Sequence, residues 1–284
     1  MASQGEGNVG LHQLLSLHLG ILSGVALQVR PHRLVLEGIR PRGSCVVSGV
    51  FWLLQEGSSQ NLAKHVEEEA RDLGGESFTR FMDSLYEKIH ALAESGDVSD
   101  NLAAVRAIDE LIDVQLGEIA TKIAKFASCL RNVFEHKKDS EVLINASRAL
   151  GHLAATGGAL TADVVEYQVK KSLEWLQGER VENHRLAAVL ILKEMAENAP
   201  TVFNVHVSDF IEAVWVALRD PKVQVRERAV KALRACLCVI EKRETRWRVQ
   251  WYYRMFERTQ DGLGVNASVD SIHGSLLAVG ELLR

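Results

Sequence analysis

An apolar pattern recurs five times along this chain at nearly regular intervals. In each copy a small residue is followed three, four and seven positions later by apolar residues, and these offsets place all four on one face of a helix. The five quartets are Ala104, Ala107, Ile108 and Leu111; Ala146, Ala149, Leu150 and Leu153; Ala188, Ile191, Leu192 and Met195; Ala229, Ala232, Leu233 and Cys236; and Ser275, Ala278, Val279 and Leu282. Their first members are 42, 42, 41 and 46 residues apart. A fixed period in the forties is typical of stacked helical hairpins.

Each hairpin requires a partner helix ahead of the one that carries a quartet. Apolar stripes predict these partners at residues 77–93, 118–134, 161–176 and 207–218, with a last one beginning at residue 250. Thr161 is expected to act as the N-cap of its helix. The sequence therefore predicts an all-α fold, an α-solenoid of HEAT- or armadillo-like helical hairpins with about five repeats over residues 61–284, in which the quartets are buried between neighbouring helices.

Residues 1–60 do not share the repeat. The apolar run at residues 11–29 has no Lys or Arg before it, and two histidines and two glycines interrupt it, which argues against a signal peptide and against a membrane span. Acidic residues are absent between Glu6 and Glu37, so an organelle transit peptide stays open as an alternative. We expect an atypical leader that is disordered or poorly packed.

The four cysteines show no paired framework and no CxxC motif, which fits a reducing compartment such as the cytoplasm, with the nucleus as a second location. Cys236 and Cys238 point to different faces of one predicted helix. No further Cys or His lies at ligand spacing, so we expect no metal site, and both cysteines are expected to pack as small apolar residues.

The net charge of −4 does not indicate a nucleic-acid binder, but the local charge is uneven. Residues 61–119 hold 14 acids against 5 Lys or Arg, and residues 222–258 hold 11 Lys or Arg against 4 acids. In a solenoid these two segments are far apart, so they would face different partners.

Irregular loops as well as helix faces carry a family resemblance between residues 187 and 277. The runs that carry it are AAVLILKEMAENAP at 187–200, TVFNVHV at 201–207, VALRDP at 216–221, VRE at 225–227, ALRACL at 232–237, RWRVQWY at 246–252 and IHGSLL at 272–277. They closely resemble the N-terminal HEAT region of the target-of-rapamycin kinases, most of all the plant form. The resemblance covers residues 61–284, and the leader departs from it.

This resemblance implies a segment of a very large serine/threonine protein kinase whose rapamycin-binding and kinase domains lie near a distant C-terminus. It also implies a scaffold role, in which the solenoid contacts the regulatory subunit raptor and the second kinase copy. The chain stops within an apolar helix, Ser275–Leu282, with no polar capping repeat after it. We therefore expect the beginning of a longer solenoid, open at its C-terminal end.

No catalytic or cofactor-binding residue is expected in this chain. The sequence has no glycine-rich GxGxxG loop, no catalytic-loop Asp–Asn pair and no Asp-Phe-Gly motif. The histidines lie on different predicted repeats and no nucleophile or carboxylate stands at a fixed spacing from them, so an independent enzyme is disfavoured. These histidines are His90, His136, His152, His184 and His206.

One basic segment near the C-terminal end is the candidate interaction surface. Its cations are Lys242, Arg243, Arg246, Arg248 and Arg254, and they alternate with Trp247, Trp251, Tyr252 and Tyr253. Such residues bind single-stranded nucleic acid through phosphate contacts and base stacking. A solvated basic loop beside a helix with core aromatics, or a protein partner, is the favoured interpretation, because no nucleic-acid-binding motif accompanies the run. We expect no small-molecule substrate.

Overall fold

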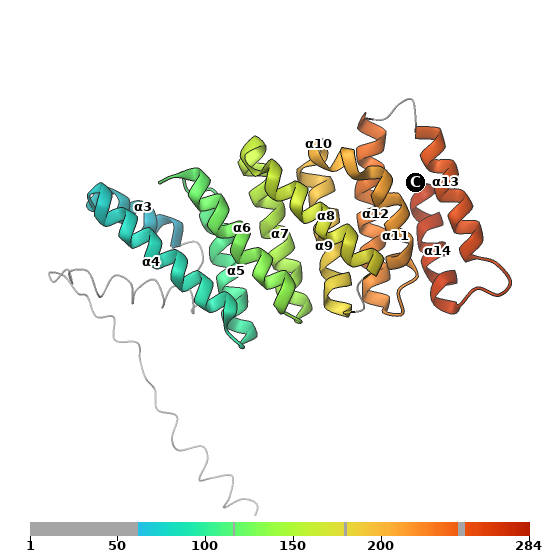
Figure 1. Cartoon of the computed structure of the whole chain (residues 1–284), viewed down its shortest axis with the longest axis horizontal. Helices are drawn as coiled ribbons and strands as arrows, with labels where there is room; N and C mark the ends of the chain where they lie inside the picture. The colour runs from blue at the N-terminus through green and yellow to red at the C-terminus, as the bar shows by residue number, and fades with distance from the viewer. Residues whose placement is uncertain (1–61, 116, 179–180, 244–247) are drawn as a thin grey trace, which may run out of the picture. The chain divides into compact units, whose positions relative to one another are not determined.

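A computed structural model describes residues 62–115, 117–178, 181–243 and 248–284 (Figure 1). The leader predicted at residues 1–60 lies outside them. The described residues are helical or lie in the short connections between helices, and none of them forms a β-strand. The elements are α3 (Leu62–Asp72), α4 (Gly75–Glu94), α5 (Val98–Ile112), α6 (Ile119–His136), α7 (Ser140–Gly157), η2 (Gly158–Thr161), α8 (Ala162–Gly178), α9 (Glu182–Asn198), α10 (Pro200–Phe203), η3 (Asn204–His206), α11 (Val207–Leu218), α12 (Val223–Arg243), α13 (Arg248–Gly262) and α14 (Val269–Leu282).

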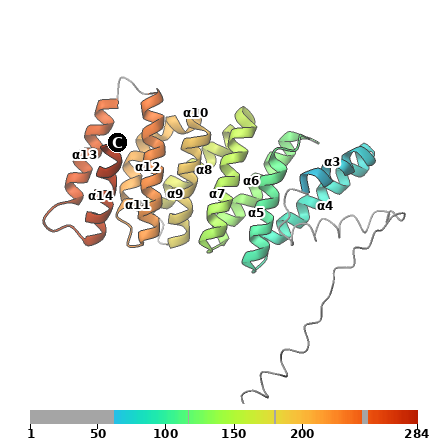
Figure 2. The same ribbon diagram turned by 180° about the vertical axis from the view of Figure 1, so that it is seen from behind.

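Consecutive helices pair into hairpins: α4 with α5, α6 with α7, α8 with α9, α11 with α12 and α13 with α14. The second helices α5, α7, α9, α12 and α14 contact one another in chain order, and they lie side by side from both directions (Figures 1 and 2). The all-α solenoid predicted from the period is therefore confirmed for the described part of the chain.

Each second helix carries one quartet. All residues of the first four quartets, from Ala104 to Cys236, expose 1% or less of their surface. In the fifth quartet Ser275 and Ala278 are buried, whereas Val279 and Leu282 are only half-buried. The expectation of full burial is wrong for these last two residues, because the described neighbours of α14, namely α11, α12 and α13, lie on the side that carries Ser275 and Ala278.

Short polar side chains begin three of the second helices. Asp97 accepts a hydrogen bond from the backbone N–H of Ser99, and the Ser268 hydroxyl accepts one from Ser271. Asp139 accepts from the backbone N–H groups of the second and third residues of α7. These side chains satisfy amides that have no partner within the helix, and each cap typically contributes about 1 kcal/mol.

Thr161 is not an N-cap, contrary to the sequence prediction. The chain passes from α7 through the 3₁₀ turn η2 directly into α8, and Thr161 is the last residue of that turn. Its hydroxyl donates backwards to the carbonyl oxygens of Ala154 and Gly158. The local motif is suited to a cap, but the preceding helical turn gives the hydroxyl nearer acceptors.

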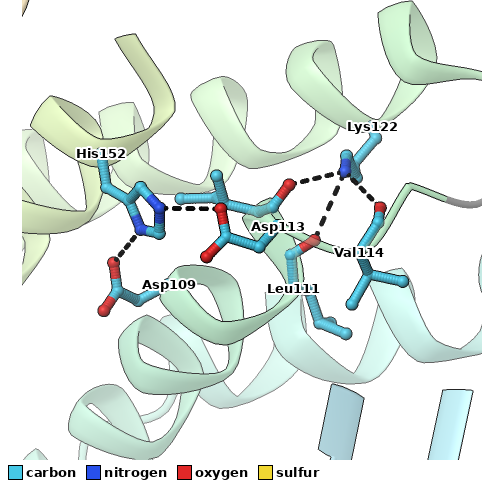
Figure 3. Close-up of polar contacts among 7 residues, drawn as sticks. Asp109, Leu111, Asp113, Val114, Lys122 and His152 are labelled. Atoms are coloured by element: carbon cyan, nitrogen blue, oxygen red, sulfur yellow. Dashed lines mark hydrogen bonds and ion pairs between the residues drawn. The ribbon is translucent and has the colours of Figure 1, made fainter. Parts of the chain in front are cut away.

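His152 ties α7 to α5 by lying between two carboxylates (Figure 3). Its Nδ1 lies 2.9 Å from Oδ1 of Asp109, and its Nε2 lies 3.0 Å from Oδ1 of Asp113. A ring that donates to carboxylates through both nitrogens is the charged imidazolium. Burial lowers the pKa of His152, but the hydrogen bond to Asp109 and the charge of Asp113 outweigh it, so the pKa is raised.

Lys122 of α6 caps the C-terminal end of α5 (Figure 3). Its side chain is buried, and its ammonium donates to the carbonyl oxygens of Ile112 at 2.8 Å and Val114 at 2.7 Å, with Leu111 at 3.4 Å. The last carbonyls of a helix lack intrahelical partners and carry partial negative charge, so a cation there is favourable. Burial lowers the pKa of Lys122, and the charge of Asp113 opposes that shift.

A buried polar network joins three second helices. Asp220, in the turn before α12, accepts from the side chain of Arg185 on α9. Arg226 of α12 donates to the backbone carbonyl of Asp220, to the carboxylate of Asp270 at 2.7 Å and to the ring of His273 at 2.9 Å. A buried guanidinium is stable only when such partners satisfy its donors. The network therefore fixes α9, α12 and α14 relative to one another.

Gly274 allows α14 to approach the end of α11 at backbone distance. A Cβ atom added at this position would overlap the backbone carbonyl of Leu218. Gly280, on the same helix, has open space at the corresponding position. The glycine at 274 is therefore required by packing and not by the helix itself.

We predict that His152→Gln removes a pH-dependent part of the stability. The raised pKa means that the His152 contribution is fully present below about pH 6.5, the ordinary histidine value, and is lost as the pH rises through the higher folded-state pKa. The stability difference between wild type and variant, measured by urea unfolding from pH 5.5 to 8.5, should therefore shrink with rising pH. His136→Gln is the matched control, because His136 is exposed and its hydrogen bond to the Asn132 carbonyl lies within its own helix. A difference that stays constant across this range would contradict the prediction.

We also predict that Gly274→Ala lowers the free energy of unfolding by about 2 kcal/mol or more, because the new methyl group must displace the Leu218 carbonyl. Gly280→Ala should be neutral or stabilising by up to about 1 kcal/mol, since alanine is the better helix former. Thermal melting of the two variants checks this pair. Equal melting temperatures would show that α14 is not held against α11.

Candidate interaction surface

The structure places four of the five predicted surface cations, and they lie on two helices. Lys242 and Arg243 form the end of α12, whereas Arg248 and Arg254 lie on α13. Arg246 falls within residues 244–247, outside the described part of the chain, as does Trp247. The described cations of the basic run therefore belong to two different helices.

Lys242 and Arg243 border a groove of about 650 Å³ between the α9–α10 corner and the second half of α12. The guanidinium of Arg243 reaches across to α10 and donates to the hydroxyl of Thr201 at 2.6 Å. The groove is lined by Ala196, Glu197, Pro200, Arg234, Ala235, Cys238, Val239, Lys242 and Arg243. It combines an apolar floor with charged walls.

The origin of this groove lies in the sequence of α9 and α10. The backbone of Ala199 leaves the helical conformation, with φ −131° and ψ 52°, and Pro200 begins α10. Proline suits a first helical position because it has no N–H to leave unpaired. The direction of the chain changes at this point, and the last turn of α12 lies beside the short helix α10.

The charges in this groove are not balanced. Arg234 pairs with Glu281 at 2.9 Å, and Glu197 pairs with Lys193 at 2.7 Å. Among the described residues, no carboxylate lies within ion-pair distance of Lys242 or Arg243. The acid of the groove is thus neutralised by a neighbour, while Lys242 and Arg243 have no carboxylate partner in the part of the chain that the structure describes.

Arg248 and Arg254 have local partners instead. Arg248 lies 3.1 Å from a carboxylate oxygen of Glu241, and its guanidinium carbon lies 5.7 Å from the Tyr252 ring centre. Arg254 lies 3.8 Å from Glu212 and 5.6 Å from the ring centre of Trp251. Both cations are therefore partly neutralised, and each is close to one of the rings that the sequence offered for base stacking.

Two of the aromatic side chains belong partly to the core. Trp251 and Tyr252 are half-buried and pack against it, whereas Tyr253 is 63% exposed. Tyr253 lines a second groove, of about 500 Å³, between α13 and the end of α14. The groove is lined by Arg248, Val249, Tyr252, Tyr253, Phe256, Leu282 and Leu283. This apolar face is not among the sequence predictions, although the helical spacing of Val249, Tyr253 and Phe256 could have indicated it.

The cysteines differ from the sequence expectation in one respect. Cys236 is fully buried, and burial raises the pKa of its thiol. Cys238 is exposed in the α9/α10–α12 groove, so its expected burial is wrong. The two residues do point to different faces of α12, because two positions along a helix correspond to more than half a turn.

The histidines do not converge on a site. His90, His136, His152, His184 and His206 lie on α4, α6, α7, α9 and η3, respectively. His90 and His136 contact residues of their own helices, whereas His184 stacks on Trp175 of the preceding helix, with ring centres 4.7 Å apart. Within the described residues, no group of three or more His, Cys, Asp or Glu side chains could hold a metal ion.

One apolar stretch, Pro200–Leu218, is long enough to cross a membrane by length and composition alone. In this structure 56% of its apolar window is buried. The stretch is weak evidence for a membrane span, since a helix in the core of a fold has the same composition.

No family model matches the sequence. Individual relatives do. The chain is 71% identical over 223 residues to the serine/threonine-protein kinase TOR of Oryza sativa subsp. japonica, and 66% identical over 230 residues to that of Arabidopsis thaliana. These alignments cover 78% and 81% of this chain and 9% of each relative. The kinase tor1 of Schizosaccharomyces pombe is 36% identical over 231 residues, which is 81% of this chain and 10% of that protein.

The alignments therefore cover most of this chain but only a small part of each relative, because the chain spans about a tenth of the length of the relatives it matches. The resemblance to target-of-rapamycin kinases is confirmed, and this chain belongs to that family as a partial TOR region, matching one segment of the TOR serine/threonine-protein kinases.

Proposed function

We propose that this chain is an interaction segment of a TOR-type protein kinase, whose helical-repeat surface assembles with a raptor-like regulatory subunit and with the second kinase copy in nutrient and growth signalling. The relationship to TOR kinases supports the kinase context. The groove beside Lys242 and Arg243 is the structural observation that carries the docking role, because these two cations have no carboxylate partner among the described residues. The cytoplasm, with the nucleus as a second location, is proposed as its compartment.

The surface of a repeat array suits this role physically. The quartets pack between neighbouring helices, so the outward side chains remain available to bind partners over an extended area. Charged side chains on such a surface orient partners and speed their association more than they add affinity. We propose that the kinase chemistry of the relatives resides in parts of those proteins that this chain does not match.

A stand-alone adaptor that binds nucleic acid through residues 242–254 is the second candidate. It is supported by the exposed ring of Tyr253 and by the cations of α13. It is the weaker candidate, because Arg248 and Arg254 are paired with carboxylates and lie near Tyr252 and Trp251, whose half-buried rings pack against the core. Base stacking requires free ring faces.

The docking role predicts competition. Purified chain, added in excess, should reduce the binding of intact TOR kinase to its raptor-like subunit, measured by surface plasmon resonance with the subunit immobilised. An unrelated helical-repeat protein of similar net charge is the control for non-specific effects. The folded chain is added at a hundredfold excess over intact kinase, on the order of the excess that fills a site. Undiminished binding of the kinase under these conditions would contradict the proposed raptor-like partner.

The chain itself should neither bind ATP nor transfer phosphate. Its sequence lacks a phosphate-binding glycine loop and the Asp and Asn residues that hold magnesium in protein kinases. Isothermal titration with Mg-ATP and a radiolabelled phosphate-transfer assay check this expectation. Labelling of a protein substrate that persists through successive purification steps would contradict it.

A further inference from the structure

We propose that the groove between the α9–α10 corner and the second half of α12 is a docking site for an acidic peptide segment of a partner protein. This proposal rests on the proposed function as a protein-interaction surface and adds the place and the chemistry of one contact. The occupant is a segment in which Asp or Glu residues flank an apolar residue.

The shape of the groove supports a peptide. Its floor is made of short apolar side chains, among them Ala235 and Val239, which are 4% and 3% exposed, together with Ala196 and Pro200. Small floor residues leave room for a side chain from outside, and a volume of about 650 Å³ is of the size that binding clefts commonly have. An inserted apolar side chain would remove this floor from water.

The charge supports an acidic occupant. Exposed residues Lys231, Arg234, Cys238 and Lys242 follow one another at intervals of three and four along α12, so they form one stripe. Arg234 is already paired with Glu281 at 2.9 Å, and Arg243 donates to a neutral hydroxyl. The cations of Lys242 and Arg243, without carboxylate partners among the described residues, are therefore available for carboxylates of a partner.

The same observations disfavour nucleic acid in this groove. None of its lining residues is aromatic, so bases would have no ring to stack on. Lys242 and Arg243, which lack carboxylate partners only as far as the described residues go, would also neutralise few phosphates, whereas the affinity of nucleic-acid binding grows with the number of phosphates contacted. The exposed ring of Tyr253 lies in the other groove, between α13 and α14.

Binding of a defined probe to the full chain tests the proposal. The probe is a fluorescein-labelled peptide of twelve residues with four Glu around a central Leu, and its control is the same peptide with Lys in place of Glu. Fluorescence anisotropy should show binding of the Glu peptide only. Lys242→Glu combined with Arg243→Glu should weaken it by at least about tenfold, since like charges would then face each other.

A matched variant separates this effect from a change in net charge. Arg106→Glu combined with Lys138→Glu alters two exposed cations on α5 and after α6 by the same amount, and should leave binding within about twofold of wild type, because separated sites act independently. Both double variants should keep the circular dichroism and melting temperature of wild type, as their side chains are exposed.

Cys238 gives a second readout that locates the site. Among the described cysteines it is the exposed one, while Cys129 and Cys236 are buried. In a Cys45→Ser background, bound Glu peptide should slow the reaction of Cys238 with a maleimide by at least about threefold, because an occupied groove excludes the reagent. An unchanged rate at saturating peptide would place the peptide elsewhere and overturn the proposal.

Other outcomes also decide. Equal binding of the Lys peptide, or equal binding of the Glu peptide to the Lys242→Glu and Arg243→Glu variant, overturns the proposal. A single-stranded oligodeoxythymidine that binds more tightly than the peptide and depends on the same two residues assigns the groove to nucleic acid. If the peptide results are as expected but the chain does not compete with intact kinase, the acidic-peptide site is supported and the proposed raptor-like partner is contradicted. If the Lys242→Glu and Arg243→Glu variant competes as well as wild type, the groove is contradicted as the docking site, while the proposed function is supported.

Discussion

The stacking of the second helices depends on a small side chain at the head of each quartet. Ala104, Ala146, Ala188 and Ala229 are fully buried, and Ser275 is 1% exposed. A larger side chain at such a position would push neighbouring helices apart, since interiors are packed at the density of organic crystals. The distances across the polar contacts between repeats depend on this spacing.

The sequence predicts much of this fold because the period repeats. One quartet could arise by chance, but five at intervals of 41 to 46 residues cannot easily do so, and the burial of the first four follows from the alternation of hairpins. Single positions are less predictable. Thr161 has the chemistry of a helix cap, yet the turn before it is itself helical and takes its hydroxyl. The local capping preference of a residue is overridden when the folded structure offers its side chain a nearer hydrogen-bond acceptor.

The polar contacts between repeats could have been sought at the repeat spacing. His152 lies 43 and 39 residues from Asp109 and Asp113, and Arg226 lies 44 and 47 residues from Asp270 and His273. Each separation is close to one repeat. The α9/α10–α12 groove is different, because it arises from the helix break at Pro200 and from the position of the last turn of α12, which no short motif records. The basic run also misled, since sequence neighbours Arg243 and Arg248 belong to different helices with different partners.

The contact between Gly274 and the Leu218 carbonyl has a mechanical consequence. No side chain lies between the two backbones there, so there is no rotamer that could change to let α14 slide along α11. The neighbouring joint is held in addition by the donors of Arg226, whose acceptors lie on Asp220, Asp270 and His273. A force applied to the hairpin α13–α14 is therefore transmitted to α11 and α12 as a rigid-body rotation, and α14 does not slide locally along α11. In a repeat protein, whose units contact only their neighbours, the joint between the hairpins α11–α12 and α13–α14 is therefore a stiff one.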